Sequence, residues 1–446
     1  MHRFRILAAL PLAAGILAAC TDTVDTPVAL SPDGARVSAT VISGTPSCPG
    51  GVVTVGDGDT LSGQVNISSG CTFTVTHADL NGDNKVTIYG DANVAPSALV
   101  IHQGARIRAV GSAAVPIVFT PTGGSTTPGA WGGIVLIGSA QTNDATATVE
   151  GIPGSVAYGG SNDTSSIGDM RYVRIADAGY QLLVNNELNG LSLYGVGCNP
   201  ADTLEYIQVH RGSDDGFEFF GGCADLRYAV ATGNEDDSFD YSFGWRGRGQ
   251  FWIALQAKTV GDKGIEADND DAGTTGTPTT NPYLLNLTLV GRDTALTANA
   301  KVPDSTMVHS GNWGIQLRRN VRSTIRSSVV IGFDEACNST GSSTHLVDRS
   351  VFFGKAVSNC TTTAGTLRTV NPQIFNPFAR NSTADFRYAS VASPLNSGAF
   401  SPVPTTHPAG IAGTTGSWFV QTSYVGAAPV RSGATAWYAG WTNWTF

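Results

Sequence analysis

The stretch Asp215-Gly216-Phe217-Glu218-Phe219 decides the fold, because its pattern of any residue, Gly or Ser, apolar, polar, apolar recurs along the chain. The copies begin at Asn189, Asp215, Asp237, Lys263 and Trp313, in steps of 26, 22, 26 and 50 residues. A repeat of this length indicates stacked units that bury their apolar faces against their neighbours. Alternation with a period of two predicts a strand in each copy. The last step is either two units or one unit with insertions.

Each unit contains a second strand as well, at 171–175, 205–209 and 227–231. Several short strands per unit, with no sustained 3.6-residue apolar pattern, are typical of a parallel β-helix. We therefore predict an all-β solenoid with coils of about 22–26 residues, stacked along one axis. Insertions between coils are loops where binding functions often lie, and they are expected at Pro121–Gly129, Gln141–Ser166, Asp271–Pro282 and Arg292–Met307.

The composition fits a turn-rich β protein. The chain has 446 residues with 54 glycines, only 14% charged residues and a formal net charge of −9. Such a chain does not have the composition of a disordered protein, and its acidity argues against nucleic acid as a partner.

The N-terminus has the pattern of an export signal. Two arginines precede an apolar run from Ile6 to Ala19, which is too short to span a bilayer. The run ends in Leu17-Ala18-Ala19-Cys20, which resembles the lipobox of bacterial lipoproteins and implies cleavage before Cys20 and its lipidation. Residues 1–19 are then a signal peptide and 20–47 a lipidated tether, with a membrane as partner. An ordinary secretory signal is the alternative. Asp22 is not adjacent to Cys20, which favours the outer membrane by analogy with lipoprotein sorting.

Six further cysteines are spaced in pairs one coil apart. The separations are 23, 25 and 23 residues for Cys48 and Cys71, Cys198 and Cys223, and Cys337 and Cys360. Equivalent positions on stacked coils lie about 4.8 Å apart, which suits a disulfide, and an exported protein meets an oxidising compartment. We predict these three disulfides; metal ligation or free thiols are the alternatives.

Several phrases occur in an order that resembles a family of exported right-handed β-helix proteins of Gram-negative cell envelopes, many of them lipoproteins. The phrases are Pro116–Thr120 (PIVFT), Gly129–Leu136 (GAWGGIVL), Asn186–Leu191 (NELNGL), Asp214–Gly222 (DDGFEFFGG), Gly261–Asn269 (GDKGIEADN) and Trp437–Trp444 (WYAGWTNW). The resemblance implies a right-handed solenoid and an envelope location. It supplies no catalytic residues.

Superposing the central coils places acidic residues in columns. The candidate metal ligands are Asp214, Asp215, Glu218, Asp236, Asp237, Asp240, Asp262 and Glu266. Stacked carboxylates repel one another, and raised pKa values, basic neighbours or a bound cation would relieve this. Ca²⁺ suits such oxygen-rich groups. A solvated acidic face with no metal is the other interpretation.

A catalytic interpretation rests on Asp214, Asp215 and Glu218, with His210 close by in sequence, since paired carboxylates serve glycoside hydrolases. Against it, the Gly-His-Gly and Arg-x-Lys phrases of β-helical polygalacturonases are missing from the sequence, and no pectate lyase arginine motif is evident. We therefore favour a non-catalytic envelope module that binds a surface polysaccharide or an outer-membrane protein. A polysaccharide lyase or glycoside hydrolase is the alternative.

Two aromatic features complete the sequence picture. Tyr172, Tyr206 and Tyr228 form a column that is either a solenoid ladder or a sugar-stacking face. The aromatic segment from Trp418 to Phe446 is expected to cover the last coil of a solenoid domain spanning 48–446, because an open end would expose strand edges.

Overall fold

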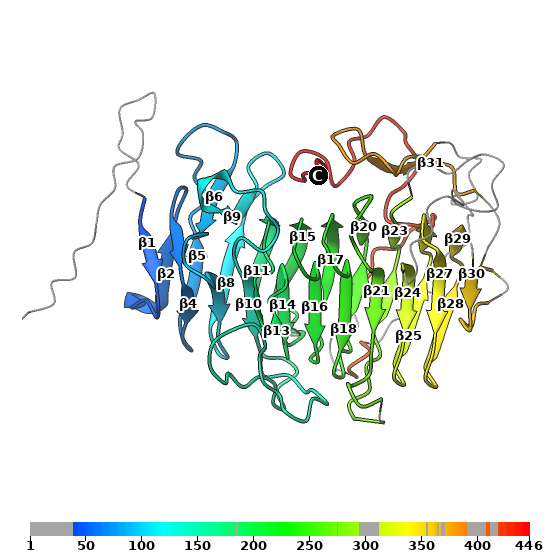
Figure 1. Ribbon diagram of the computed structural model, residues 1–446, viewed down its shortest axis with the longest axis horizontal. Coiled ribbons are helices and arrows are strands. Elements are labelled where there is room, and N and C mark those ends of the chain that lie inside the picture. Colours follow the sequence, from blue (N-terminus) through cyan, green and yellow to red (C-terminus); the bar gives the residue numbers. More distant parts are fainter. Residues whose placement is uncertain are drawn as a thin grey trace, which may run out of the picture.

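The protein is a right-handed parallel β-helix (Figure 1). The computed structural model describes residues 39–183, 186–273, 275–293, 312–353, 356–363, 365–366, 371–389, 407–410 and 418–446. Two large parallel sheets run along the molecule, one of 10 strands (sheet I) and one of 18 (sheet II). The predicted repeats at Asn189, Asp215, Asp237, Lys263 and Trp313 are strands of sheet I, which confirms that each copy forms a strand.

Sheet I contains one strand from each coil. In chain order its strands are β4 (Gln64–Ile67), β7 (Ala98–Ile101), β10 (Gly133–Ile137), β14 (Leu191–Tyr194), β16 (Phe217–Phe220), β18 (Phe239–Ser242), β21 (Lys263–Ala267), β24 (Trp313–Leu317), β27 (Glu335–Ser339) and β30 (Ala356–Ser358). Lys263 pairs directly with Trp313, so the 50-residue step between them is one coil with an insertion. Much of that insertion, 294–311, lies outside the described residues.

Sheet II forms the rest of each coil. Its strands are β1 (Val41–Ser43), β2 (Val52–Val55), β3 (Thr60–Ser62), β5 (Thr72–Val75), β6 (Val86–Gly90), β8 (Arg106–Val110), β9 (Ile117–Pro121), β11 (Gly168–Ala176), β15 (Thr203–His210), β17 (Leu226–Thr232), β19 (Arg248–Gln250), β20 (Ile253–Leu255), β22 (Tyr283–Leu285), β23 (Thr288–Val290), β25 (Arg322–Arg326), β26 (Val329–Ile331), β28 (Thr344–Asp348) and β29 (Val351–Phe353). Two short antiparallel hairpins join β12 (Gln181–Leu183) to β13 (Asn186–Glu187) and β31 (Ile374–Asn376) to β32 (Asp385–Tyr388).

A left-handed residue bends sheet II at one position in each central coil. Tyr206 has a φ of +55°, and its neighbours Glu205 and Ile207 pair with Arg227 and Ala229 while Tyr206 itself is skipped. Residues with side chains rarely adopt this conformation, so packing on the bent column has to hold it in place.

Apolar side chains fill the interior between the two sheets. Phe217 and Phe239 stack with ring centroids 5.2 Å apart, and both are fully buried. Trp245 and Trp252 continue the same core. Each buried aromatic of this kind contributes about 1.5–3 kcal/mol to folding through the surface it removes from water.

The three predicted disulfides are present. Cys48–Cys71, Cys198–Cys223 and Cys337–Cys360 have Cα separations of 6.0, 5.1 and 6.1 Å. Two short 3₁₀ turns, η1 (Pro49–Gly51) and η2 (Thr122–Gly124), are the helical elements of the described chain, and none of its helices could cross a membrane.

The predicted end of the tether is too late in the sequence. The tether was expected to extend to residue 47, yet β1 pairs in parallel with β3 and Thr40 N donates to Asp59 Oδ1 at 2.7 Å. The first coil therefore starts inside the predicted tether, because an alternating Val-Ile-Ser stretch can pair with the next coil. Cys20 and the rest of 1–38 lie outside the described residues.

The segment 418–446, called the strap, does not act as a cap on the last coil. It runs along the outer face of sheet II (Figure 1). Trp441 contacts Tyr172 on an early coil, and Gly426 N donates to Ser327 O on a later coil. Its aromatic rings meet the aromatic column of sheet II, where Trp437 and Trp441 contact Tyr206.

Candidate functional site

An acidic column lies on the outer face of sheet I. Glu218, Asp240 and Glu266 occupy paired positions on β16, β18 and β21. Phe217 and Phe219, on either side of Glu218, are fully buried, so strand alternation directs the acids outward. This confirms the predicted register of the column.

The turns that enter these strands supply the other acids, and their backbone fixes the carboxylates. Asp237 N donates to Asp215 Oδ1 at 2.8 Å, and Lys263 N donates to Asp237 Oδ1 at 2.6 Å. Asp215 and Asp237 are only 6% and 4% exposed. Each carboxylate is thus held by the backbone of the next coil, which orients it before any ligand arrives.

All eight predicted metal ligands come together. We call this set the acidic strip; its members are Asp214, Asp215, Glu218, Asp236, Asp237, Asp240, Asp262 and Glu266. They form four overlapping groups of three, and within each group one ligand atom per residue lies within 4.8 Å of the others. Oxygens that coordinate one Ca²⁺ at about 2.4 Å lie at most about 4.8 Å apart, so the donor set fits this ion.

Burial makes the charged form of these acids unfavourable. The pKa of Asp214 is raised to about 8, first by burial and then by the charge of Asp236. Burial, followed by the charges of neighbouring acids, also raises the pKa values of Asp215, Glu218, Asp237 and Asp240 well above their usual range. Protons or a cation must therefore offset the negative charge.

Two basic side chains border the strip at one end. The Lys263 ammonium contacts Asp262 and lies 3.3 Å from Glu266 Oε1. The Arg318 guanidinium contacts Glu266 and lies 2.7 Å from Asp268 Oδ2. These two cations offset negative charge near the third coil of the strip. The acids of the first two coils need protons or a bound cation for the same purpose.

Three buried oxygens at the strip make no hydrogen bond to the described residues. They are Asp240 Oδ1, Gln316 Oε1 and Glu266 Oε1, the last of which lies in the ion pair with Lys263. Gln316 is 6% exposed and pairs with Glu266 in the next coil, so its amide continues the acidic column. A buried acceptor without a donor is costly, and Asp240, which belongs to two of the candidate cation groups, would gain a partner from a bound cation.

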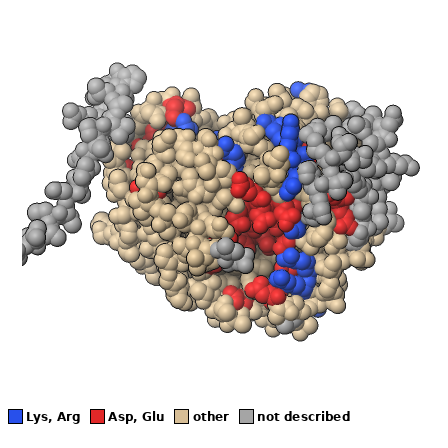
Figure 2. Space-filling view, viewed as in Figure 1, with Lys and Arg blue, Asp and Glu red and all other residues tan. Residues whose placement is uncertain are grey.

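An insertion forms a wall beside the strip. A cleft of about 280 Å³ lies between Glu218 and Asp240 on one side and Asp144 to Glu150 on the other. Figure 2 shows the acidic patch in the middle of this face, with basic groups at its edge. Burial and the charge of Glu187 raise the pKa of Glu150 to about 7. Sequence reasoning missed Glu150 because it lies in an insertion outside the repeat.

His210 is not part of the strip, which corrects the catalytic grouping. It ends β15 in sheet II and is 2% exposed, with Nδ1 2.8 Å from Thr232 Oγ1 and Nε2 3.2 Å from Asn443 Nδ2. Burial lowers its pKa to about 3. Although Asp214 is four residues away, the chain turns between the sheets there. Asp214 and Asp215 do share a group with Asp236, because they lie in that turn.

The tyrosine column is a covered ladder. Tyr206 stacks on Tyr172 and Tyr228 at centroid distances of 4.4 and 4.3 Å. Trp437 and Trp441 of the strap meet these rings edge-on. The rings therefore pack within the protein, which favours the ladder over an open sugar-stacking face.

A model of the pectate-lyase-like β-helix domain family matches residues 53–442. The chain belongs to this family. No curated protein and no solved structure matched the chain. In this pectate-lyase-like β-helix the acidic strip spans three successive coils, on the outer face of sheet I and in the turns that lead into it.

Proposed function

We propose that this pectate-lyase-like β-helix is a lipid-anchored envelope protein that binds a surface glycan without cleaving it and holds Ca²⁺ on its acidic strip. The observation that carries the proposal is the grouping of eight outward or turn-borne carboxylates into four clusters of cation-coordinating size. The chain's family is named for its likeness to pectate lyase, an enzyme that degrades a polysaccharide, and this supports a carbohydrate ligand. An outer-membrane protein is the other partner that the insertions would suit.

Two observations support a bound cation: the concentrated negative charge of the strip and a buried oxygen that lacks a hydrogen-bond donor. Acids with pKa values this far above normal ionise at neutral pH only if a positive charge compensates them. Asp240 Oδ1 points to the same need independently, since it has no donor among the described residues. Ca²⁺ accepts the flexible, oxygen-only donor set better than a metal that prefers nitrogen or sulfur.

Binding is favoured over cleavage by the positions of the bases. Lys263 and Arg318 are engaged in ion pairs with the acids that they touch, and His210 is buried in sheet II. A lyase needs a base beside the sugar ring, and a hydrolase needs an acid and a base or nucleophile on either side of the scissile bond. The alternative, a polysaccharide lyase or glycoside hydrolase, is supported by the cluster of Asp215, Glu218 and Asp240.

The cation is tested by thermal unfolding of purified protein in EDTA and in millimolar Ca²⁺. We expect Ca²⁺ to raise the melting temperature of the wild type and of Asp169→Asn, a control acid on sheet II, but not of Asp240→Asn. Equal melting curves in EDTA and Ca²⁺ for the wild type would refute the metal.

The glycan is tested by retention on immobilised acidic and neutral polysaccharides, with soluble fragments assayed in parallel. Retention without new chain ends is the expected result. Fragmentation that Asp215→Asn or Glu218→Gln abolishes would establish the enzyme instead. If no polysaccharide is retained or cleaved, glycan binding is wrong and a protein partner takes its place.

A further inference from the structure

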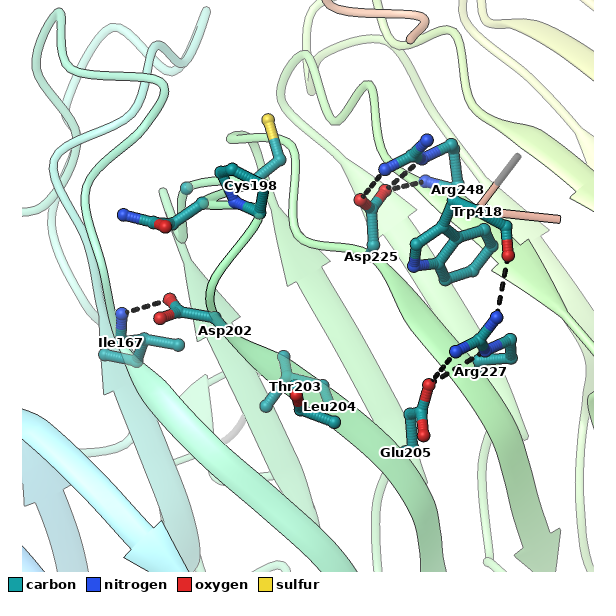
Figure 3. Close-up of a pocket in the computed structure, with 13 residues that line it drawn as sticks. Ile167, Cys198, Asp202, Thr203, Leu204, Glu205, Asp225, Arg227, Arg248 and Trp418 are labelled. Carbon is teal, nitrogen blue, oxygen red and sulfur yellow. Dashed lines mark hydrogen bonds and ion pairs between the residues drawn. The ribbon is translucent and has the colours of Figure 1, made fainter. Parts of the chain in front are cut away.

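A second pocket lies away from the acidic strip, at the corner where the chain passes from sheet I into sheet II. Its lining residues follow the ends of β14, β16 and β18, whereas the turns of the strip precede these strands. The pocket has a volume of about 430 Å³, within the range of about 300–1,000 Å³ that small-molecule sites occupy. Figure 3 shows Cys198 and Asp202 on one side of it, and Trp418 with Arg227 and Arg248 on the other.

Two arginine–carboxylate pairs form the walls. Arg248 Nε and Nη2 donate to Asp225 Oδ1 and Oδ2 at 3.0 and 2.5 Å. Arg227 Nε donates to Glu205 Oε1 at 2.9 Å. The side chains of Arg248 and Glu205 are only 8% and 13% exposed. Arg248 thus bonds both oxygens of Asp225, whereas Arg227 donates from Nε and Nη2 to one oxygen of Glu205. Charge-assisted pairs of this kind are stiff and place donors next to acceptors.

Trp418, the first residue of the strap, completes the wall. Its ring centroid lies 5.2 Å from the guanidinium carbon of Arg227 and 4.9 Å from that of Arg248. Its carbonyl oxygen accepts a hydrogen bond from Arg227 Nη1 at 2.7 Å, and Phe419 beside it is buried. The indole itself is partly exposed and lines the pocket. It is thus a fixed aromatic surface.

The charge of the lining excludes one class of ligand. Three carboxylates, from Asp202, Glu205 and Asp225, face two guanidiniums. There is no excess of positive charge to attract an anion. Asp202 accepts hydrogen bonds from Ser166 Oγ and Ile167 N, both at 2.6 Å, so its carboxylate is fixed in orientation. The lining offers oriented donors and acceptors and one aromatic surface.

We infer that this pocket, the Trp418 pocket, binds a neutral sugar unit of a glycan. Neighbouring hydroxyls of a pyranose can donate to Glu205 or Asp202 while they accept from Arg227, and the C–H surface of the ring packs on Trp418. The inference rests on the proposed glycan binding and names a site and a sugar class for it; the site is separate from the acidic strip and needs no cation. The strap supplies Trp418, so the strap builds the site as well as covering sheet II.

The test is a titration of the full-length protein in EDTA with methyl glycosides of glucose, galactose, mannose and N-acetylglucosamine, followed by ligand-observed NMR. At least one glycoside should bind. Trp418→Ala should weaken binding about tenfold, as expected for loss of an aromatic contact, and Trp418→Phe should weaken it less. Trp313→Ala, which removes a tryptophan beside the acidic strip, should bind like the wild type.

Arg227→Lys gives a second variant that keeps the charge but loses the fork, and it should also weaken binding. Both variants are checked for wild-type melting so that unfolding is not mistaken for lost binding. Methyl galacturonide is titrated in parallel as the anionic counterpart of methyl galactoside. The inference is overturned if none of the neutral glycosides binds, if Trp418→Ala binds as tightly as the wild type, or if methyl galacturonide binds better than methyl galactoside. Asp240→Asn should leave the titration unchanged, so this result and that for the acidic strip can fail independently.

Discussion

Gln250 and Val420 exchange two hydrogen bonds although 170 residues separate them. Gln250 Nε2 donates to Val420 O and Val420 N donates to Gln250 Oε1, each at 2.8 Å. Gln208 makes the same pair of hydrogen bonds with Asn443: Gln208 Nε2 donates to Asn443 O at 2.6 Å, and Asn443 N donates to Gln208 Oε1 at 2.8 Å. Both glutamines are fully buried. Each side-chain amide thus pairs with the backbone of the strap as a neighbouring strand would. These pairs hold the strap against sheet II without a continuous ladder of backbone hydrogen bonds.

Replacing Gln250 by Ala should lower the free energy of unfolding by about 0.5–1.5 kcal/mol, because the backbone N–H and carbonyl of Val420 lose their partners. Denaturant unfolding measures the change, and limited proteolysis should cut the strap faster. Gln64→Ala, which removes a partly exposed amide on β4, is the matched control. Equal stability of the two variants would show that the strap does not depend on this clamp.

Stability of the metal-free protein should fall as pH rises. Asp214 and Glu150 have pKa values of about 8 and 7 in the folded protein, whereas unfolded carboxyls titrate near 4. The folded state retains protons that the unfolded chain has released. Its full stability is therefore present below about pH 4 for these groups and is lost progressively up to about pH 8.

Melting temperatures in EDTA between pH 5 and 8 check this sign. We expect a decline that Asp214→Asn reduces and that Ca²⁺ removes, since the cation takes the place of the protons. A melting temperature that is constant or rises over this interval in EDTA would contradict the raised pKa values.

Loss of the Cys198–Cys223 disulfide should destabilise the protein by about 2–4 kcal/mol, as expected for a closed loop of 25 residues. The double variant Cys198→Ala, Cys223→Ala avoids a free thiol, and calorimetry gives the change. Non-reducing peptide mapping of the wild type should recover three links, each between neighbouring cysteines. A peptide that joins Cys71 to Cys198 would be incompatible with the stacked register.

Cys20→Ser should convert a membrane-bound protein into a soluble exported one, because the lipid would have no sulfur to join. Fractionation of cells that produce each form, with fatty-acid labelling, is the measurement. Retention of the Ser variant in the membrane fraction would argue against anchoring at Cys20.

The sequence predicts those parts of the site that follow the repeat. Glu218, Asp240 and Glu266 recur at one position in successive coils, so their alignment follows from counting residues. Glu150 could not be placed in this way, because its insertion has no register. The partners of Trp418 and Val420 were also out of reach, since their contacts join aperiodic segments to coils about 170–190 residues earlier. His210 was misassigned because the chain turns from sheet II toward sheet I after it, so residues that are close in sequence there lie on different sheets.

The strap has a consequence for how the solenoid comes apart. In a stack whose coils touch only their neighbours, one end can unravel while the rest persists, and stability is a sum of local interfaces. Here one segment is bonded to coils that never meet: Trp441 lies against Tyr172, and Gly426 N donates to Ser327 O at 2.7 Å. Detaching any of these coils breaks contacts that the strap shares with the others. The rod should therefore melt in a single concerted transition across these coils, as a globular domain does.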